Sequence, residues 1–192
     1  MEHTLYLMRH FQTEANINGM FMGQQDLPAI LPVHISNDYP AEWKIDTGKK
    51  VYIMCSPLLR TLQTAEYIIT KFSKIEWTKE IIPALSERCL GDFEGLSKSM
   101  LNTNDYYFRN NKLILNSTPP NAEHIDSFIK RVISVAPRID NILSTQDVLI
   151  ISHVQVLRTL IGYYRGYSLE ETKNNWYSIQ IKNGEIIRIN IN

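Results

Sequence analysis

The sequence predicts an α/β protein, a three-layer sandwich in which helices cover both faces of a mostly parallel central sheet. The prediction depends on short apolar runs that alternate with amphipathic stretches, a pattern typical of parallel strands joined by helices. Polar, potentially reactive residues follow several of the apolar runs. Because ligands bind at the carboxyl ends of the strands in such sheets, we expect these residues to share one site. The 192 residues fit a single domain over 1–192.

Short apolar runs in the first half of the chain indicate buried strands. They span Thr4–Met8 and Val51–Cys55, and a further strand is predicted near Lys79–Ile82. Prolines and an Asn-Asp pair interrupt the segment from Phe11 to about Lys50, so we expect mostly loop with one short turn there. The second strand leads into a predicted helix from about Leu59 to Phe72, with Ser56 as its N-cap and Pro57 at the first helical position.

The second half begins with a polar segment, 101–122, which is rich in asparagine and indicates an irregular flap. The stretch from Glu123 to Leu143 is amphipathic and predicts a helix that Pro137 kinks. A strongly apolar strand is predicted at Asp147–Ser152, and a helix follows at Gln155–Tyr164.

The last predicted element is a β-hairpin. Its arms are Ser178–Lys182 and Glu185–Ile191, and Asn183-Gly184 forms the turn between them. The prediction follows from the Asn-Gly pair between two apolar runs, which is typical of a tight hairpin turn.

The composition argues against several classes of partner. Twenty basic and twenty acidic side chains cancel, so no overall field attracts nucleic acid or an anionic membrane. No stretch of about 18 apolar residues is present to span a bilayer. We expect no signal peptide, because the start has neither a basic segment nor a long apolar run. The two cysteines lie outside any metal-like spacing and fit a cytoplasmic protein with reduced thiols. We expect a small-molecule partner, and either a monomer or a homodimer.

Five residues have the side chains that phosphoryl transfer needs: Arg9, His10, Arg60, Glu87 and His153. The transferred group spreads its charge over several oxygens, so the site needs positive groups in fixed positions. Arginine can hold a phosphate through two N–H groups. Histidine can act as the nucleophile when a carbonyl holds its second ring nitrogen, and a carboxylic acid can protonate the departing alkoxide.

Seven segments, in order, resemble the motifs of the histidine phosphatase superfamily, the group that includes cofactor-dependent phosphoglycerate mutase. The first, LMRHFQTEAN at Leu7–Asn16, is similar to the RHG(E/Q)(S/T)xxN signature. The others are Phe21–Asp26, Cys55–Ala65, Leu85–Gly95, Pro120–His124, Ile151–Val154 and Asn175–Ile179. The resemblance implies the phosphoglycerate mutase-like fold and a phosphoric monoester hydrolase of the phosphatase branch that uses no metal or other cofactor.

The resemblance also implies a role for each matched residue. His10 would take the phosphoryl group, and Glu87 would donate a proton and later activate water. Arg9, Arg60 and His153 would surround the phosphate. Further phosphate or substrate contacts are implied at Thr13, Asn16, Gly23, Gln24, Arg88 and Val154. For Arg88, a solvated surface position is an equal alternative.

The chain departs from the family pattern at three places. Phe11 and Val154 replace glycines that follow the two histidines, and we expect both side chains to face the phosphate end of the pocket. The family's first long helix, expected after Asp26, is replaced by the proline-broken segment. These changes bear on the shape of the pocket, because glycine allows a close approach to a ligand.

Several alternatives remain open from the sequence. Glu14, Glu94 and Glu123 are rival acids. His3, His34 and His124 show no metal-ligand spacing and are expected to face solvent, with His124 as the exception to test because it replaces a pocket-proximal serine of the family pattern. An aromatic cluster near Trp176 fits either a sugar-stacking surface or core and sheet edge. The leading function is hydrolysis of a small phosphorylated metabolite through a phosphohistidine. The alternatives are a phosphoglycerate-type phosphomutase, for which the flap is short, and a lapsed module that only binds phosphate ligands.

Overall fold

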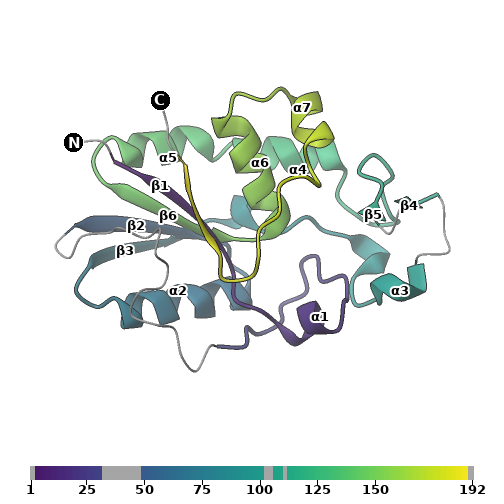
Figure 1. The fold of residues 1–192 in the computed structure, drawn as a ribbon, viewed down its shortest axis with the longest axis horizontal. Coiled ribbons are helices and arrows are strands. Elements are labelled where there is room, and N and C mark those ends of the chain that lie inside the picture. Colours follow the sequence, from purple (N-terminus) through teal and green to yellow (C-terminus); the bar gives the residue numbers. More distant parts are fainter. Residues whose placement is uncertain (1–2, 32–48, 102–105, 110–111, 190–192) are drawn as a thin grey trace.

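A five-stranded, mostly parallel sheet forms the centre of the fold (Figure 1). The computed structural model describes residues 3–31, 49–101, 106–109 and 112–189. The strands are β1 (Leu5–Arg9), β2 (Lys50–Cys55), β3 (Glu76–Ile81), β6 (Asp147–Ser152) and β7 (Ile186–Ile189). They lie in the order β3-β2-β6-β1-β7, and only the pairing of β7 with β1 is antiparallel. The predicted sheet is therefore confirmed.

Helices cover both faces of this sheet, as predicted. Helix α2 (Leu59–Lys71) lies on one face, and α4 (Ile125–Ile133), α5 (Ala136–Leu143) and α6 (Val154–Tyr164) lie on the other (Figure 1). Alternate β1 residues point to opposite faces: Leu5 and Leu7 join the core under α4 and α6, whereas Met8 joins the core under α2. Burial on both faces explains why β1 and β6 are almost continuous apolar runs.

The long amphipathic stretch forms two helices. Helix α4 ends at Ile133 and α5 begins at Ala136. Pro137 lies in the first turn of α5, where its missing N–H has no helical partner to lose. The predicted interruption of the helix is confirmed. It is a break between two helices just before Pro137, and not a kink of one helix at Pro137.

The predicted C-terminal hairpin is wrong. Residues 178–182 form no strand, and β7 pairs with β1 instead of with that segment. The Asn183-Gly184 turn is present, but the Gly184 N–H bonds to the carbonyls of Arg9 and His10 at 3.0 and 3.2 Å. Pairing along β1 satisfies backbone groups that would otherwise be unpaired at the edge of the sheet.

Short elements gather at the carboxyl ends of β1, β2 and β6 (Figure 1). They are α1 (Glu14–Ile17), α3 (Lys98–Leu101), β4 (Phe108–Arg109), β5 (Lys112–Leu113) and α7 (Leu169–Asn174), with 3₁₀ turns at Pro83–Leu85 and Gly91–Phe93. The predicted flap thus contains regular structure, and β4 and β5 pair antiparallel. Phe93, Phe108 and Leu113 form a small core beneath it. Most of the proline-broken segment, 32–48, lies outside the described residues.

Candidate active site

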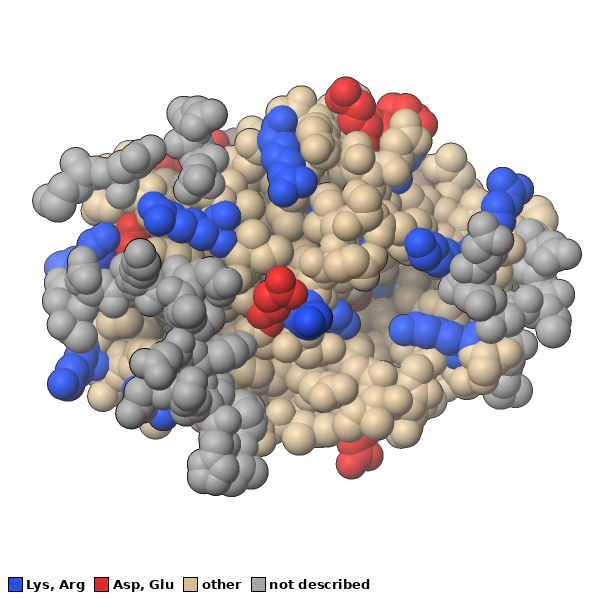
Figure 2. Space-filling model, in the orientation of Figure 1, with Lys and Arg blue, Asp and Glu red and all other residues tan. Residues whose placement is uncertain are grey.

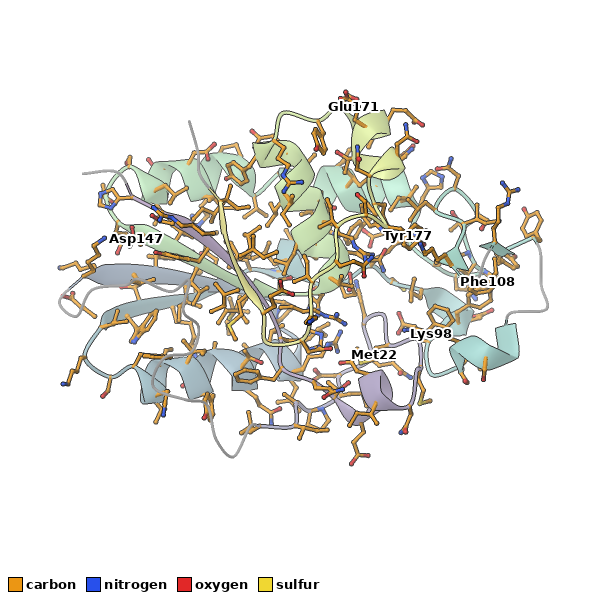
Figure 3. All side chains as sticks on the ribbon, in the orientation of Figure 1. Met22, Lys98, Phe108, Asp147, Glu171 and Tyr177 are labelled. Atoms are coloured by element: carbon orange, nitrogen blue, oxygen red, sulfur yellow. The ribbon has the colours of Figure 1, made fainter. Side chains whose placement is uncertain are left out.

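A cavity of about 240 Å³ opens at the carboxyl ends of β1 and β6. Of the residues expected at the site, its wall contains Arg9, His10, Asn16, Gly23, Glu87 and Val154. Figure 2 shows a hollow with Lys and Arg side chains on both sides. In Figure 3, the labelled side chains of Met22, Lys98 and Tyr177 lie at this end of the molecule, and Asp147 lies at the other end of the sheet.

His10 directly follows β1 and is almost completely buried. Its Nδ1–H donates to the Phe11 carbonyl at 2.6 Å, and no described residue hydrogen-bonds its Nε2. Burial, followed by the positive charge of Arg60, lowers the pKa of His10 from 6.5 to about 3. His10 is therefore a neutral imidazole near pH 7. The bond at Nδ1 leaves the Nε2 lone pair available for attack.

Arg60 and Arg9 place two guanidinium groups near this ring. Arg60, in the first turn of α2, donates to the carbonyls of Gln25 at 2.6 Å and Gly23 at 2.8 Å. Arg9 donates to the Ile181 carbonyl at 2.7 Å. The Nε atoms of both arginines are buried without a partner among the described residues. Buried donors normally have partners, and an anion in the cavity would lie beside Arg9, which is part of the wall. Arg60 and His153 are completely buried and are not part of the wall.

Glycine is required at position 23 because the chain turns tightly there. Gly23 has a φ of +48°, and a Cβ atom at this position would lie 2.0 Å from the Glu94 side chain. A side chain at this position would therefore strain the turn and push against the Glu94 carboxylate.

His153 follows β6, and its ring centroid is 5.2 Å from that of His10. Its Nε2 lies 2.8 Å from Ser56 Oγ. Ser56 Oγ also accepts the Leu58 N–H at 3.3 Å. The other ring nitrogen of His153, Nδ1, is buried without a described partner.

Ser56 was predicted as the N-cap of α2, and this prediction is wrong. The N-cap is Leu58, which has no side-chain cap hydrogen bond. The helix begins three residues after Ser56, and the hydroxyl bonds to His153. Sequence reasoning missed Ser56 as a site residue, although its position directly after β2 was a signal.

Glu87 is buried and lines the cavity. Burial raises the pKa of its carboxyl, while the Arg88 N–H and the charges of Arg60 and Arg9 act in the opposite direction. The net rise favours the protonated form, as a general acid requires.

None of the three rival acids is part of the cavity wall. Glu94 accepts the backbone N–H groups of Gln24 and Leu90, each at 2.9 Å. Glu123 pairs with Arg131 at 2.8 Å. Glu14 is exposed on α1 and does not line the cavity.

The remaining predicted contacts divide into two groups. Asn16 and Val154 line the cavity, but Thr13, which is buried, and Gln24, which is exposed, are not part of its wall. Thr13 caps α1, and Gln24 donates to the Glu87 carbonyl at 2.9 Å. Arg88 is completely buried, so the solvated alternative is wrong. Its Nε donates to the Glu123 carbonyl at 2.9 Å, and it is not part of the cavity wall.

Phe11 does not face the phosphate end, which overturns its predicted position. Its ring belongs to the core under α2, with an edge-to-face contact to Tyr67 at 5.4 Å between centroids. Its backbone N–H donates to Thr64 Oγ1 at 3.0 Å. The chain turns towards α2 directly after His10, and the apolar ring is buried there.

Sequence reasoning missed several cavity residues. Lys98, Lys112 and Arg158 line the cavity. Arg158 could have been identified by its place on α6, four residues after Val154 and so on the same helical face. Trp176, which is core, and Tyr177 also line it. Among the described residues, no three His, Cys, Asp or Glu side chains are grouped as metal ligands would be, and no described helix is long and apolar enough to cross a bilayer.

Comparisons with known proteins found a matching family model, related sequences and similar structures. The model of the histidine phosphatase superfamily (branch 1) matches residues 5–192. A 2,3-bisphosphoglycerate-dependent phosphoglycerate mutase of Bartonella henselae is 32% identical over 180 residues, which cover 89% of this chain and 85% of the mutase. An adenosylcobalamin/alpha-ribazole phosphatase of Salmonella typhimurium is 29% identical over 160 residues, which cover 82% of this chain and 77% of the phosphatase. The alpha-ribazole phosphatase structure from Shigella flexneri has a TM-score of 0.73 at 23% identity, covering 98% of this chain and 91% of that one.

Proposed function

Because this chain belongs to the histidine phosphatase superfamily, branch 1, we propose that it hydrolyses a small phosphorylated metabolite through a phosphohistidine at His10. The state of His10 carries the proposal. The ring is neutral, its Nδ1–H is held by the Phe11 carbonyl at 2.6 Å, and Nε2 has no described hydrogen-bond partner in a cavity wall. A histidine that only stabilised the core would have no need of this free nitrogen.

The reaction has two steps. In the first, His10 Nε2 attacks phosphorus, the bond from phosphorus to the ester oxygen breaks, and Glu87 gives its proton to the departing alkoxide. Arg9 and Arg60 stabilise the charge that spreads over the phosphoryl oxygens. In the second step, Glu87 takes a proton from water, the water oxygen attacks phosphorus, and phosphate leaves His10. Enzyme, alcohol and phosphate account for all atoms.

Trapping the intermediate tests the proposal. Quenching turnover of a ³²P-labelled phosphomonoester should leave label on the protein that is lost in acid and stable in base. His10→Ala should remove the label and the turnover together. His3→Gln, just before the other end of β1, is the matched control and should keep both. Normal turnover by His10→Ala would refute the mechanism.

A phosphoglycerate-type mutase is the second candidate, and the outer cavity favours it. Lys98 and Lys112 line the cavity, and neither forms a salt bridge among the described residues. Their ammonium groups lie 5.6 Å from the centroid of the Phe21 ring and 5.1 Å from that of Tyr177. These cations would suit a substrate that carries a carboxylate besides its phosphate.

The products separate the candidates. A hydrolase releases inorganic phosphate from a phosphoglycerate, whereas a mutase returns the isomer with no net phosphate release. A lapsed binding module would bind vanadate but release no phenol from p-nitrophenyl phosphate. Phosphate-release and isomer assays on the same protein preparation decide among the three.

A further inference from the structure

The turn before β7 contributes a side chain to the loop that contains the nucleophile. Asn183 Nδ2 donates to the His10 carbonyl at 3.1 Å and to Asn16 Oδ1 at 3.2 Å. These partners are 173 and 167 residues away in sequence. We propose that Asn183 is a positioning residue for phosphate binding and transfer, which acts through Asn16 and His10. The inference rests on the proposed function and extends it to a segment that does not line the cavity.

The first part of the argument concerns the Asn16 amide. Its oxygen is within 3.2 Å of three donors: the Thr13 N–H, the Thr13 hydroxyl and Asn183 Nδ2. An amide whose oxygen is held on one side presents its NH₂ group on the other. Asn16 lines the cavity, so Asn183 helps to direct a hydrogen-bond donor, and not an acceptor, towards the bound anion.

The second part concerns the backbone of His10. Its N–H donates to the Ser152 carbonyl at 2.9 Å, and its carbonyl accepts from Asn183 Nδ2 and the Gly184 N–H. The nucleophile is therefore held from β6 on one side and from the Asn183-Gly184 turn on the other. Misplacement of a reacting group by about 1 Å can cost about 100-fold in rate, so the loss of one restraint should be visible in turnover.

Two substitutions at Asn183 test the proposal. Asn183→Ala removes both hydrogen bonds, and we expect kcat/KM for a phosphomonoester and the affinity for vanadate each to fall about tenfold. Asn183→Asp keeps the shape of the side chain but places a carboxylate oxygen against the His10 carbonyl and Asn16 Oδ1. The fall in kcat/KM and in vanadate affinity should therefore be larger. Lys182→Ala, at the exposed neighbouring position, should match the wild type. If both Asn183 variants match it as well, the proposal is overturned.

A double-mutant cycle separates positioning from general support of the fold. If Asn183 acts through Asn16, Asn183→Ala should cost much less vanadate affinity in an Asn16→Ala background than in the wild type, because coupled residues are not additive. Equal costs in the two backgrounds would overturn the role through Asn16. Should Asn183→Ala fail to fold, Asn183→Asp replaces it in the cycle, with thermal melting as the check.

The experiment also separates this inference from the proposed function. A wild-type protein that binds vanadate but shows no turnover would overturn the hydrolase proposal, and the vanadate affinities would still decide the role of Asn183. A folded wild-type protein that binds neither vanadate nor phosphate would overturn both.

Discussion

Burial shifts the pKa values of His10 and Glu87 in opposite directions, and in each case the shift favours the neutral form. It lowers the pKa of the imidazole and raises that of the carboxyl, because a low-dielectric site disfavours either charge. A neutral imidazole has a lone pair to attack with, and a neutral carboxyl has a proton to give. The arginines supply the fixed positive charge, so neither reacting group needs to be ionised before substrate binds.

The role of Glu87 can be tested by changing the leaving group. Glu87→Gln should slow hydrolysis of an alkyl phosphate by about 10²–10⁴-fold, because a basic alkoxide needs the proton. Its effect on p-nitrophenyl phosphate should be much smaller, provided that dephosphorylation of His10 is not limiting. Steady-state kinetics on the two substrates measure the difference.

Glu14→Gln is the matched control for this experiment, because Glu14 is exposed and outside the cavity wall. It should leave both rates unchanged. An equal loss on both substrates in Glu87→Gln would instead assign Glu87 a positioning role.

At the scale of elements, the β4–β5 pair depends on neighbours because each strand has only two residues. Apolar contacts of Phe108 and Leu113 support it from below. The Tyr177 hydroxyl donates to the Leu113 carbonyl and connects the pair to the segment that follows α7. Since Tyr177 and Leu113 both line the cavity, this bond links two parts of its wall.

Tyr177→Phe should loosen the β4–β5 pair without unfolding the protein. A neutral hydrogen bond contributes about 0.5–1.5 kcal/mol, so amide hydrogen exchange at Ile114, whose N–H bonds to the Tyr107 carbonyl at 2.8 Å, should accelerate up to about tenfold. Tyr163→Phe, on α6, is the control and should not change this rate. Unchanged exchange at Ile114 in Tyr177→Phe would show that apolar packing alone holds the pair.

At the scale of the whole molecule, the buried histidines make stability depend on pH. Folded His10 has a pKa of about 3, against 6.5 when unfolded, and the pKa of His153 is lowered well below 6.5, mainly by burial. Between about pH 6.5 and 3 the unfolded chain therefore binds protons that the folded chain does not, and stability falls as the pH falls. Glu87, with its raised pKa, acts in the opposite sense.

His10→Gln isolates the contribution of one histidine to this pH dependence. Urea unfolding at pH 7.5 and pH 4.5 should show that the wild type loses more stability than the variant. The difference should be about 3 kcal/mol, because pH 4.5 is two units below the unfolded pKa and each unit counts for about 1.4 kcal/mol. Because Glu87 is present in both proteins, its contribution to the pH dependence cancels in the comparison. Equal losses in wild type and variant would mean that His10 titrates normally in the folded state.

The local pattern of the sequence determined the sheet, most of its helices and the main site residues. Continuous apolar runs such as Asp147–Ser152 predict strands buried on both faces, and the residues that follow them must lie at one edge of the sheet. This is why Arg9, His10 and His153 could be placed together before any coordinates: Arg9 and His10 line the cavity, and the His153 ring lies beside that of His10. Such inferences need only neighbours in sequence and the direction of a strand.

The tertiary structure alone decided which side chains face the cavity and which partners hold them. Phe11 belongs to the core, Ser56 bonds to His153, and the segment around Asn183 pairs with the loop of His10 in place of a hairpin partner. Each of these outcomes depends on a contact between segments far apart in the chain. A side chain's hydrogen-bond partner or packing surface is set by competition among all the groups that folding brings near it, and local periodicity carries no information about that competition.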